Sequence, residues 1–191
     1  SSDVMLALHS GRAIRFKENE ELRALGRTAS GVKGIELAND DDKAVGVLTI
    51  DNQRSNVLIV SEAGFGKRSL LEDYRITHRG GKGVATIKIT EKTGNLIAMK
   101  DVTDDDDLMI INRSGLTIRM HVDSLRILGR NTQGVKLIDL RKNDMIAAIC
   151  VVPRQEDEPE EEEGTELPTG ENGEPTEPML NSEENTESVD R

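Results

Sequence analysis

The sequence predicts an all-β protein of three tandem units of about 50 residues each, followed by an acidic tail. Short runs of alternating or apolar residues are separated by Gly, Asn and Asp, and no long segment keeps the 3.6-residue apolar period of a helix. Four sequence features also recur in the same order. We expect unit 1 at about 4–53, unit 2 at about 54–105 and unit 3 at about 106–153, with a disordered tail at 154–191.

The repeat rests on two motifs that frame each unit. A Gly-x-x-x-Arg motif occurs at 11–15, 64–68 and 115–119. An Arg-x-x-x-Gly-Val motif follows it at 27–32, 79–84 and 130–135. Because both motifs keep their order and spacing three times, chance agreement is a poor explanation.

After the second motif, each unit continues with an apolar-x-apolar segment and then a polar turn. The apolar segments are 35–37, 87–89 and 138–140, and the turns are 39–42, 91–94 and 141–144. Period-two patterns bounded by such turns predict strands. A short helix or turn is expected at 22–25 and 125–128, ahead of the second motif.

Unit 2 illustrates the expected strands, which are 56–60, 67–70, 84–89 and 96–101. Four strands in about 50 residues is the size of a propeller blade. A blade buries its sheet faces only against neighbours, and three blades leave edges that further units normally cover. Since the chain also begins with Ser1 and not Met, we expect a piece of a longer protein.

The charge is divided unevenly along the chain. Of 36 acidic and 25 basic residues, 15 acidic and two basic ones fall in 154–191, which leaves 21 acidic against 23 basic ones in 1–153. The net charge of −11 is therefore a property of the tail, and the body is mildly basic. A basic body suits a nucleic-acid partner, and we expect the tail to compete with DNA for it.

Several other chemistries find little support. Cys150 lies in an apolar run and is expected to be a buried hydrophobe, and Tyr74 is expected to pack at a blade edge. The acidic run 104–107 lacks the pattern of a calcium loop and is expected to be a solvated turn. With no recognisable catalytic or metal-ligand set, and no membrane segment or signal peptide, we expect a noncatalytic, metal-free cytoplasmic protein.

Glycine-rich basic loops are the candidate sites. The segment 64–69 fails the P-loop pattern, because a glycine is missing at the required spacing and no helix pattern follows. The segment Arg79–Gly83 suits phosphate contact, because its glycines let a ligand approach the backbone and its cations supply charge; a flexible turn is the alternative.

Equivalent charges in stacked blades lie on one rim, and few aromatic residues are present to stack single-stranded bases. The sequence therefore predicts phosphate contacts to bent duplex DNA. The candidate residues are Arg12, Arg15, Arg27 and Lys33 in unit 1, Lys67, Arg68, Arg79, Gly80, Gly81, Lys82 and Gly83 in unit 2, and Arg119, Arg130 and Lys136 in unit 3.

These loops resemble a known family. The segments 26–32 and 129–135, with 64–68, 83–84, 87–90 and 107–111, are similar to the blades of the C-terminal domain of bacterial DNA gyrase A subunits, and the resemblance covers residues 4–153. It implies a β-pinwheel, a propeller variant whose neighbours exchange strands, which wraps duplex DNA to support ATP-dependent negative supercoiling. The implied partners are the B subunit together with the remainder of the A subunit, in an A2B2 heterotetramer. ATP and magnesium are used elsewhere in that assembly, so no cofactor is expected in this chain.

One motif departs from the family pattern. The signature box of the family, Gln-Arg-Arg-Gly-Gly-Lys-Gly, normally lies in the first blade, whereas five of its seven positions appear here as Arg79–Gly83 in unit 2, with Thr77 and His78 at the first two. Two alternatives to the gyrase function stay open, namely the corresponding domain of topoisomerase IV and a protein-binding propeller scaffold.

Overall fold

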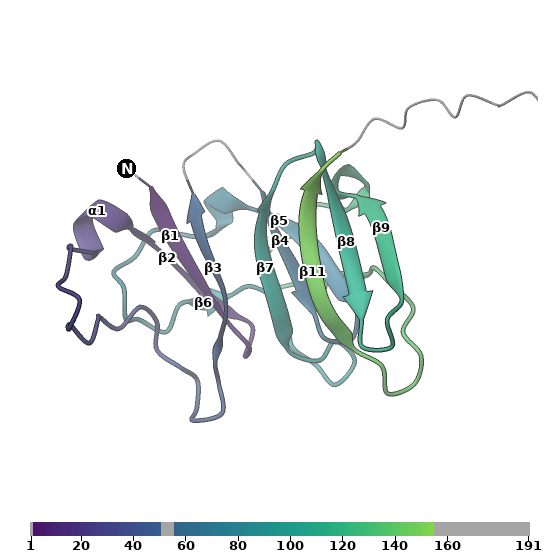
Figure 1. Cartoon of the computed structure of the whole chain (residues 1–191), viewed down its shortest axis with the longest axis horizontal. Coiled ribbons are helices and arrows are strands. Elements are labelled where there is room, and N and C mark those ends of the chain that lie inside the picture. Colours follow the sequence, from purple (N-terminus) through teal and green to yellow (C-terminus); the bar gives the residue numbers. More distant parts are fainter. Residues whose placement is uncertain (1, 51–55, 155–191) are drawn as a thin grey trace, which may run out of the picture. The chain divides into compact units, whose positions relative to one another are not determined.

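The structure, a computed structural model, describes residues 2–50 and 56–154 (Figure 1). Nearly all of its regular structure is strand, as the sequence predicts. The strands are β1 (Asp3–Leu8), β2 (Arg12–Lys17), β3 (Ala44–Ile50), β4 (Asn56–Ser61), β5 (Phe65–Leu70), β6 (Val84–Ala85), β7 (Leu96–Val102), β8 (Asp106–Asn112), β9 (Thr117–His121), β10 (Val135–Lys136) and β11 (Ile146–Pro153). One helical turn follows the second strand of each unit: α1 (Glu18–Glu21) in unit 1, η1 (Leu71–Asp73) in unit 2 and η2 (Val122–Ser124) in unit 3.

The sheets show that neighbouring units exchange a strand, which confirms the pinwheel expectation. The orders are β3-β1-β2-β6, β10-β5-β4-β7 and β11-β8-β9, and all the ladders between named strands are antiparallel. Thus β6 of unit 2 completes the sheet of unit 1, and β10 of unit 3 completes the sheet of unit 2. Within the described residues, the outer edge of β9 carries no such strand.

The exchanged strands are shorter than the sequence predicts. In unit 2 the expected strand 84–89 is reduced to β6, and 87–89 packs without joining a ladder. Ile89 packs against Gly11 of unit 1, whose φ is +80° and where an added Cβ would lie 2.7 Å from Ile89 Cγ1, and Lys88 N donates to Thr132 O of unit 3 at 3.1 Å. Residues 35–37 and 138–140 also lie outside strands. The expected helix or turn at 22–25 was misplaced, because α1 ends before it.

Two apolar layers lie between the three sheets. Alternate residues of β4 point to opposite sides, so Val57 and Ile59 join a cluster with Met5 and Leu48 of unit 1, while Leu58 and Val60 join one with unit 3. Every residue of β4 is buried. A strand covered on both faces explains the continuously apolar run of β4. In β1, which is also apolar from Val4 to Leu8, Val4 and Leu6 are only half-buried.

Three expectations for single residues were tested by the fold. Tyr74 packs in the first apolar layer, 1% exposed, which confirms its packing role. The expected burial of Cys150 was wrong: it is exposed, because Ile149 and Val151 face the core and Cys150 alternates to the other face of β11. The run 104–107 is not wholly a solvated turn either, since Asp106 and Asp107 begin β8 and are buried.

Candidate nucleic-acid interface

Two glycine-rich loops, Arg79–Gly83 and Gly129–Gly134, lie at the contacts between neighbouring units. We call these contacts seams: the first joins units 1 and 2 through β2 and β6, and the second joins units 2 and 3 through β5 and β10. Each loop leads directly into an exchanged strand, β6 or β10, that pairs with the preceding unit. Gly83 and Gly134 both have positive φ, and a Cβ added there would lie 2.4 Å from Ala13 O and 2.5 Å from Gly66 O respectively. Glycine is needed at both positions because the loop backbone touches the backbone of the neighbouring unit.

In the first loop, Arg79 bonds backbone oxygens of unit 1 across the seam, and Lys82 is exposed to solvent. Arg79 Nε donates to Glu21 O at 2.8 Å, and Nη1 donates to Lys33 O at 3.2 Å. Its side chain is 33% exposed. Lys82 is exposed, and its backbone oxygen accepts a 2.7 Å bond from Arg12 Nε. This loop therefore presents one ordered arginine and one exposed lysine beside three glycines.

In the second loop, Arg130 lies across the seam on unit 2. Its Nη1 donates to Ala85 O at 2.8 Å, and its guanidinium carbon is 5.8 Å from the centroid of the Tyr74 ring. Burial raises the pKa of the Tyr74 hydroxyl, which bonds to Thr86 Oγ1. Arg130 thus keeps a fixed direction while half-buried.

Four of the candidate cations are occupied in contacts between or within units. Arg12 donates to Lys82 O and Gly83 O, and Arg15 donates to Asp3 and to Leu71 O. Lys67 is fully buried, and Arg68, 5% exposed, donates to Leu125 O and Asp123 O and pairs with Asp104. Their charged groups hold the units together, and this placement argues against direct phosphate contact by Lys67 and Arg68.

The other candidate cations lie open to solvent in various degrees. Arg27 and Lys82 are exposed, and the side chains of Lys33, Lys136 and Arg119 are 60%, 53% and 42% exposed. Lys33 and Lys136 each have an exposed acidic neighbour three residues on, Glu36 at 4.0 Å and Asp139. Such pairs contribute little and leave both lysines available to an anionic ligand.

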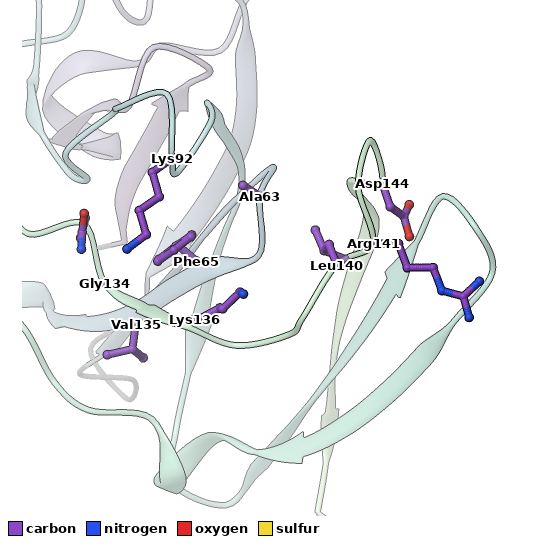
Figure 2. A pocket seen from close by; sticks show the side chains of 10 residues that line it. Ala63, Phe65, Lys92, Gly134, Val135, Lys136, Leu140, Arg141 and Asp144 are labelled. Atoms are coloured by element: carbon purple, nitrogen blue, oxygen red, sulfur yellow. The ribbon is translucent and has the colours of Figure 1, made fainter.

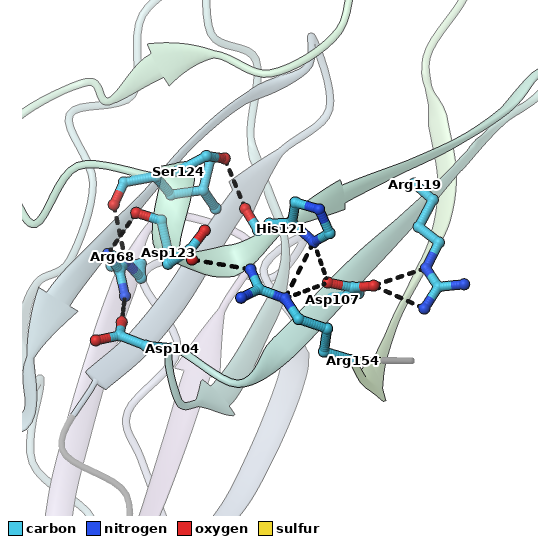
Figure 3. Close-up of polar contacts among 9 residues, drawn as sticks. Arg68, Asp104, Asp107, Arg119, His121, Asp123, Ser124 and Arg154 are labelled. Carbon is cyan, nitrogen blue, oxygen red and sulfur yellow. Dashed lines mark hydrogen bonds and ion pairs between the residues drawn. The ribbon is translucent and has the colours of Figure 1, made fainter. Parts of the chain in front are cut away.

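Unit 3 carries a charge cluster that sequence reasoning missed (Figure 3). Asp107 is 1% exposed and accepts from Arg119 Nε at 2.7 Å and, on its other oxygen, lies 2.7 Å from His121 Nδ1. Arg154 lies 3.6 Å from Asp107 and bonds Asp123 at 2.8 Å. The hydrogen bond with His121 and the charge of Arg119 lower the pKa of Asp107. The 12-residue spacing shared with Asp3 and Arg15 was the available signal.

A groove beside the second loop was also missed (Figure 2). Its volume is about 630 Å³, and its lining includes Phe65, Leu140 and the cations Lys92, Lys136 and Arg141. Lys92 Nζ is 5.3 Å from the centroid of the Phe65 ring. The groove extends from Gly134 of the second loop to Arg141 and Asp144 of the turn 141–144, so its lining carries three cations and one carboxylate.

Two other kinds of site are absent from residues 2–50 and 56–154. No group of three or more His, Cys, Asp or Glu side chains in these ranges is placed to hold a metal ion. No helix in the same ranges has the length and apolar character needed to cross a membrane.

Stacked β units that pass a short strand to the preceding unit, with basic glycine loops at both seams, define a propeller-type repeat domain. The chain belongs to the family described as the DNA gyrase C-terminal domain, a β-propeller, whose model matches residues 3–51, 55–103 and 106–153. The resemblance inferred from the sequence is therefore confirmed.

Relatives and solved structures agree with this family. The chain is 42% identical over 163 residues to the DNA gyrase A subunit of Chlamydia pneumoniae, covering 85% of this chain and 19% of that protein. It is 41% identical over 162 residues to the DNA gyrase A subunit of Staphylococcus aureus strain MRSA252, covering 84% and 18%. The chain thus spans about a fifth of these relatives.

Two solved structures share the architecture. A structure of the DNA gyrase A C-terminal domain matches with 26% identity and a TM-score of 0.70, covering 78% of this chain and 50% of that one. The C-terminal domain of DNA topoisomerase IV matches with 22% identity and a TM-score of 0.73, covering 80% and 47%, which shows the fold alone.

Proposed function

We propose that this chain is the noncatalytic, DNA-wrapping part of a gyrase A subunit, and that it bends duplex DNA along its seam loops. The observation that carries the proposal is the recurrence of a cationic glycine loop at equivalent seams, Arg79–Gly83 beside β2 and Gly129–Gly134 beside β5. Backbone amides and cations at such loops bind phosphates without reading base sequence. We therefore expect salt-dependent binding with weak sequence preference.

The exposed cations carry the proposed phosphate contacts, and the buried ones carry the scaffold. Arg27, Lys33, Lys82, Arg119 and Lys136 are solvent-accessible, and Arg79 and Arg130 are held at the surface of their loops. In this proposal, four other candidate cations join the units, namely Arg12, Arg15, Lys67 and Arg68. Since bending a short duplex costs on the order of 1–6 kcal/mol, several loops must contact DNA together.

The proposal extends to the whole protein. The partners would be the B subunit together with the remainder of the A subunit, in an A2B2 assembly of the cytoplasm, with ATP and magnesium used outside this chain. Relatives at about 40% identity are gyrase A subunits, which favours gyrase over topoisomerase IV. Negative supercoiling of relaxed plasmid by the reconstituted holoenzyme would separate the two.

Ligation of nicked circular DNA in the presence of the full chain tests wrapping directly. After protein removal, the linking number should be shifted relative to circles ligated alone, in proportion to the amount of chain bound. An unshifted distribution at saturating chain would overturn wrapping. If charge reversal at Arg79, Lys82, Arg119 and Arg130 left the DNA affinity unchanged, the result would favour a protein-binding scaffold.

A further inference from the structure

Lys67 occupies a position that is isoleucine in the other two units. In the first hairpin of each unit, Ile59 pairs with Lys67, Leu6 with Ile14 and Ile110 with Ile118. Lys67 is nevertheless as buried as a core residue, with 0% of its surface exposed. A charged residue at an apolar position of a repeat calls for a specific partner.

The partner is the loop of the next unit. Lys67 Nζ donates to Gly129 O and Arg130 O, both at 2.6 Å, and to Thr132 Oγ1 at 3.1 Å. Thr132 Oγ1 donates in turn to Gly129 O at 2.9 Å. The ammonium has three N–H donors, and all three point into one turn of the segment Gly129–Gly134.

At the seam between units 1 and 2, the residues at the equivalent positions are uncharged. Gly81 stands at the position of Thr132, since Arg79 and Arg130 begin equivalent motifs. A Cβ added at Gly81 would lie 3.7 Å from Ile14 Cδ1. One seam thus combines isoleucine with glycine, and the other combines lysine with threonine and two inward-facing carbonyls.

Burial of a charged lysine at this position is energetically unfavourable. Burial, together with repulsion by Arg130, lowers the pKa of Lys67 to about 8, while Asp73 of η1 opposes the shift. The protonated form is therefore less stable here than in water. Ile14 and Ile118 show that the hairpin itself does not need a charge.

We propose that Lys67 is a positioning residue for DNA binding. Its ammonium holds the carbonyls of Gly129 and Arg130 inward and so fixes the conformation of the loop Gly129–Gly134. In this conformation the loop presents Arg130 and the neighbouring side chains to a phosphate. The inference rests on the proposed function of that loop. Lys67 itself touches no DNA, because it is buried beneath the loop.

The variant Lys67→Ile tests the inference with the full chain and a duplex of mixed sequence. It introduces the isoleucine that the other two units have at this position, so the fold should be kept and the thermal unfolding midpoint should be equal to that of the wild type or higher. Duplex affinity should nevertheless fall about three- to tenfold, as for the loss of one ordered phosphate-contacting loop. The control Lys100→Gln removes one exposed charge from β7 and should change the affinity less.

A double-mutant cycle with Arg130→Gln separates positioning from a long-range charge effect. If Lys67 acts through the loop, Lys67→Ile should weaken binding little further once Arg130 is gone. Independent, additive losses would overturn the inference, as would an unchanged affinity of Lys67→Ile alone. Adding Thr132→Gly to Lys67→Ile rebuilds the uncharged seam and tests whether packing alone restores binding, a result that would also overturn it.

Amide hydrogen exchange provides a readout that does not depend on DNA. Residues 129–134 should exchange faster in Lys67→Ile, while β5 and β10 keep their protection. If the wild type fails to bind duplex DNA, the proposed function falls, but this measurement still decides whether Lys67 orders the loop. Unchanged exchange in the loop would overturn the anchoring itself.

Discussion

Arg119 binds Asp107 in unit 3 as Arg15 binds Asp3 in unit 1: in each pair, the arginine Nε donates at 2.7 Å to Oδ2 of an aspartate twelve residues earlier. Asp3 and Asp107 are equivalent, since each pairs across its hairpin with the residue fourteen positions on. Unit 2 has Asn56 at this position and Arg68 at the arginine position. Asn56 is buried, and its Oδ1 has no hydrogen-bond partner among the residues that the structure describes.

The unpaired Asn56 predicts a stabilising substitution. Asn56→Asp would place a carboxylate beside Arg68 in the arrangement of the other units, and we expect a gain of about 1 kcal/mol in the free energy of unfolding. Chemical denaturation at pH 7 measures it, with Asn56→Ala as the control. A loss of stability would mean that the bonds of Arg68 to Leu125, Asp123 and Asp104 leave no capacity for a further partner.

Asp107 predicts a dependence of stability on pH. Its pKa is lowered in the folded chain by the hydrogen bond with His121 and by Arg119, so its contribution is present above the unfolded pKa of about 3.9 and is lost as pH falls through the lower folded value. Asp107→Asn should lower the melting temperature at pH 7, and the difference from wild type should shrink below about pH 4. A difference that stays constant down to about pH 3 would contradict this.

The sequence was sufficient for the repeat and its longer strands, but not for the length of the exchanged strands or for side-chain burial. Alternation and turn residues are local, and they predicted β4, β5 and β7 to within two residues. The burial of Lys67 depends on oxygens 62 to 65 residues away, which no local pattern reports. Cys150 was misjudged because only the face of β11 that carries Ile149 and Val151 packs on the core and Cys150 lies on the other face. Asp107 was misjudged because it was grouped with its acidic neighbours.

Within the candidate site, the recurrence of charge marked the seams correctly but did not separate exposed from buried cations. The motif Gly-x-x-x-Arg supplies Arg15 and Arg68, whose guanidinium groups contact carbonyls of the next unit. The motif Arg-x-x-x-Gly-Val supplies the loops at the surface. Both motifs recur because every seam needs both parts, so recurrence alone does not distinguish scaffold from ligand contact.

Like Asp107, Lys67 predicts that stability rises with pH, but in the alkaline range between about pH 8 and about pH 10.4. Its pKa is about 8 in the folded chain and about 10.4 in an unfolded one. Between these values the unfolded chain keeps the proton that the folded chain has lost, so stability rises with pH. Relative to Lys67→Met, the wild type should gain up to about 3 kcal/mol from about pH 7 to about pH 10.5. Denaturation curves of both proteins at matched pH measure this, and a constant difference would refute it.

Exposed seam lysines predict the salt dependence of DNA binding. Lys82→Gln and Lys136→Gln should each weaken binding to duplexes of any sequence and reduce the slope of log K against log salt by about 0.9. Lys100→Gln is the control, because β7 lies away from both loops in sequence and sheet order. Effects confined to one DNA sequence would contradict phosphate contact.

The acidic tail predicts a gain of DNA affinity on truncation. Residues 155–191 lie outside the described part of the chain, but they hold 15 acidic residues and one arginine, a charge that opposes binding of a polyanion. Because Arg154 bonds Asp123 and lies beside Asp107, a chain ending at Arg154 isolates the charge effect, whereas one ending at Pro153 also removes these ion pairs. We expect the first truncation to bind duplex DNA more tightly at low salt and to approach the full chain as salt rises. Equal affinities at low salt would show that the tail does not compete for the rim.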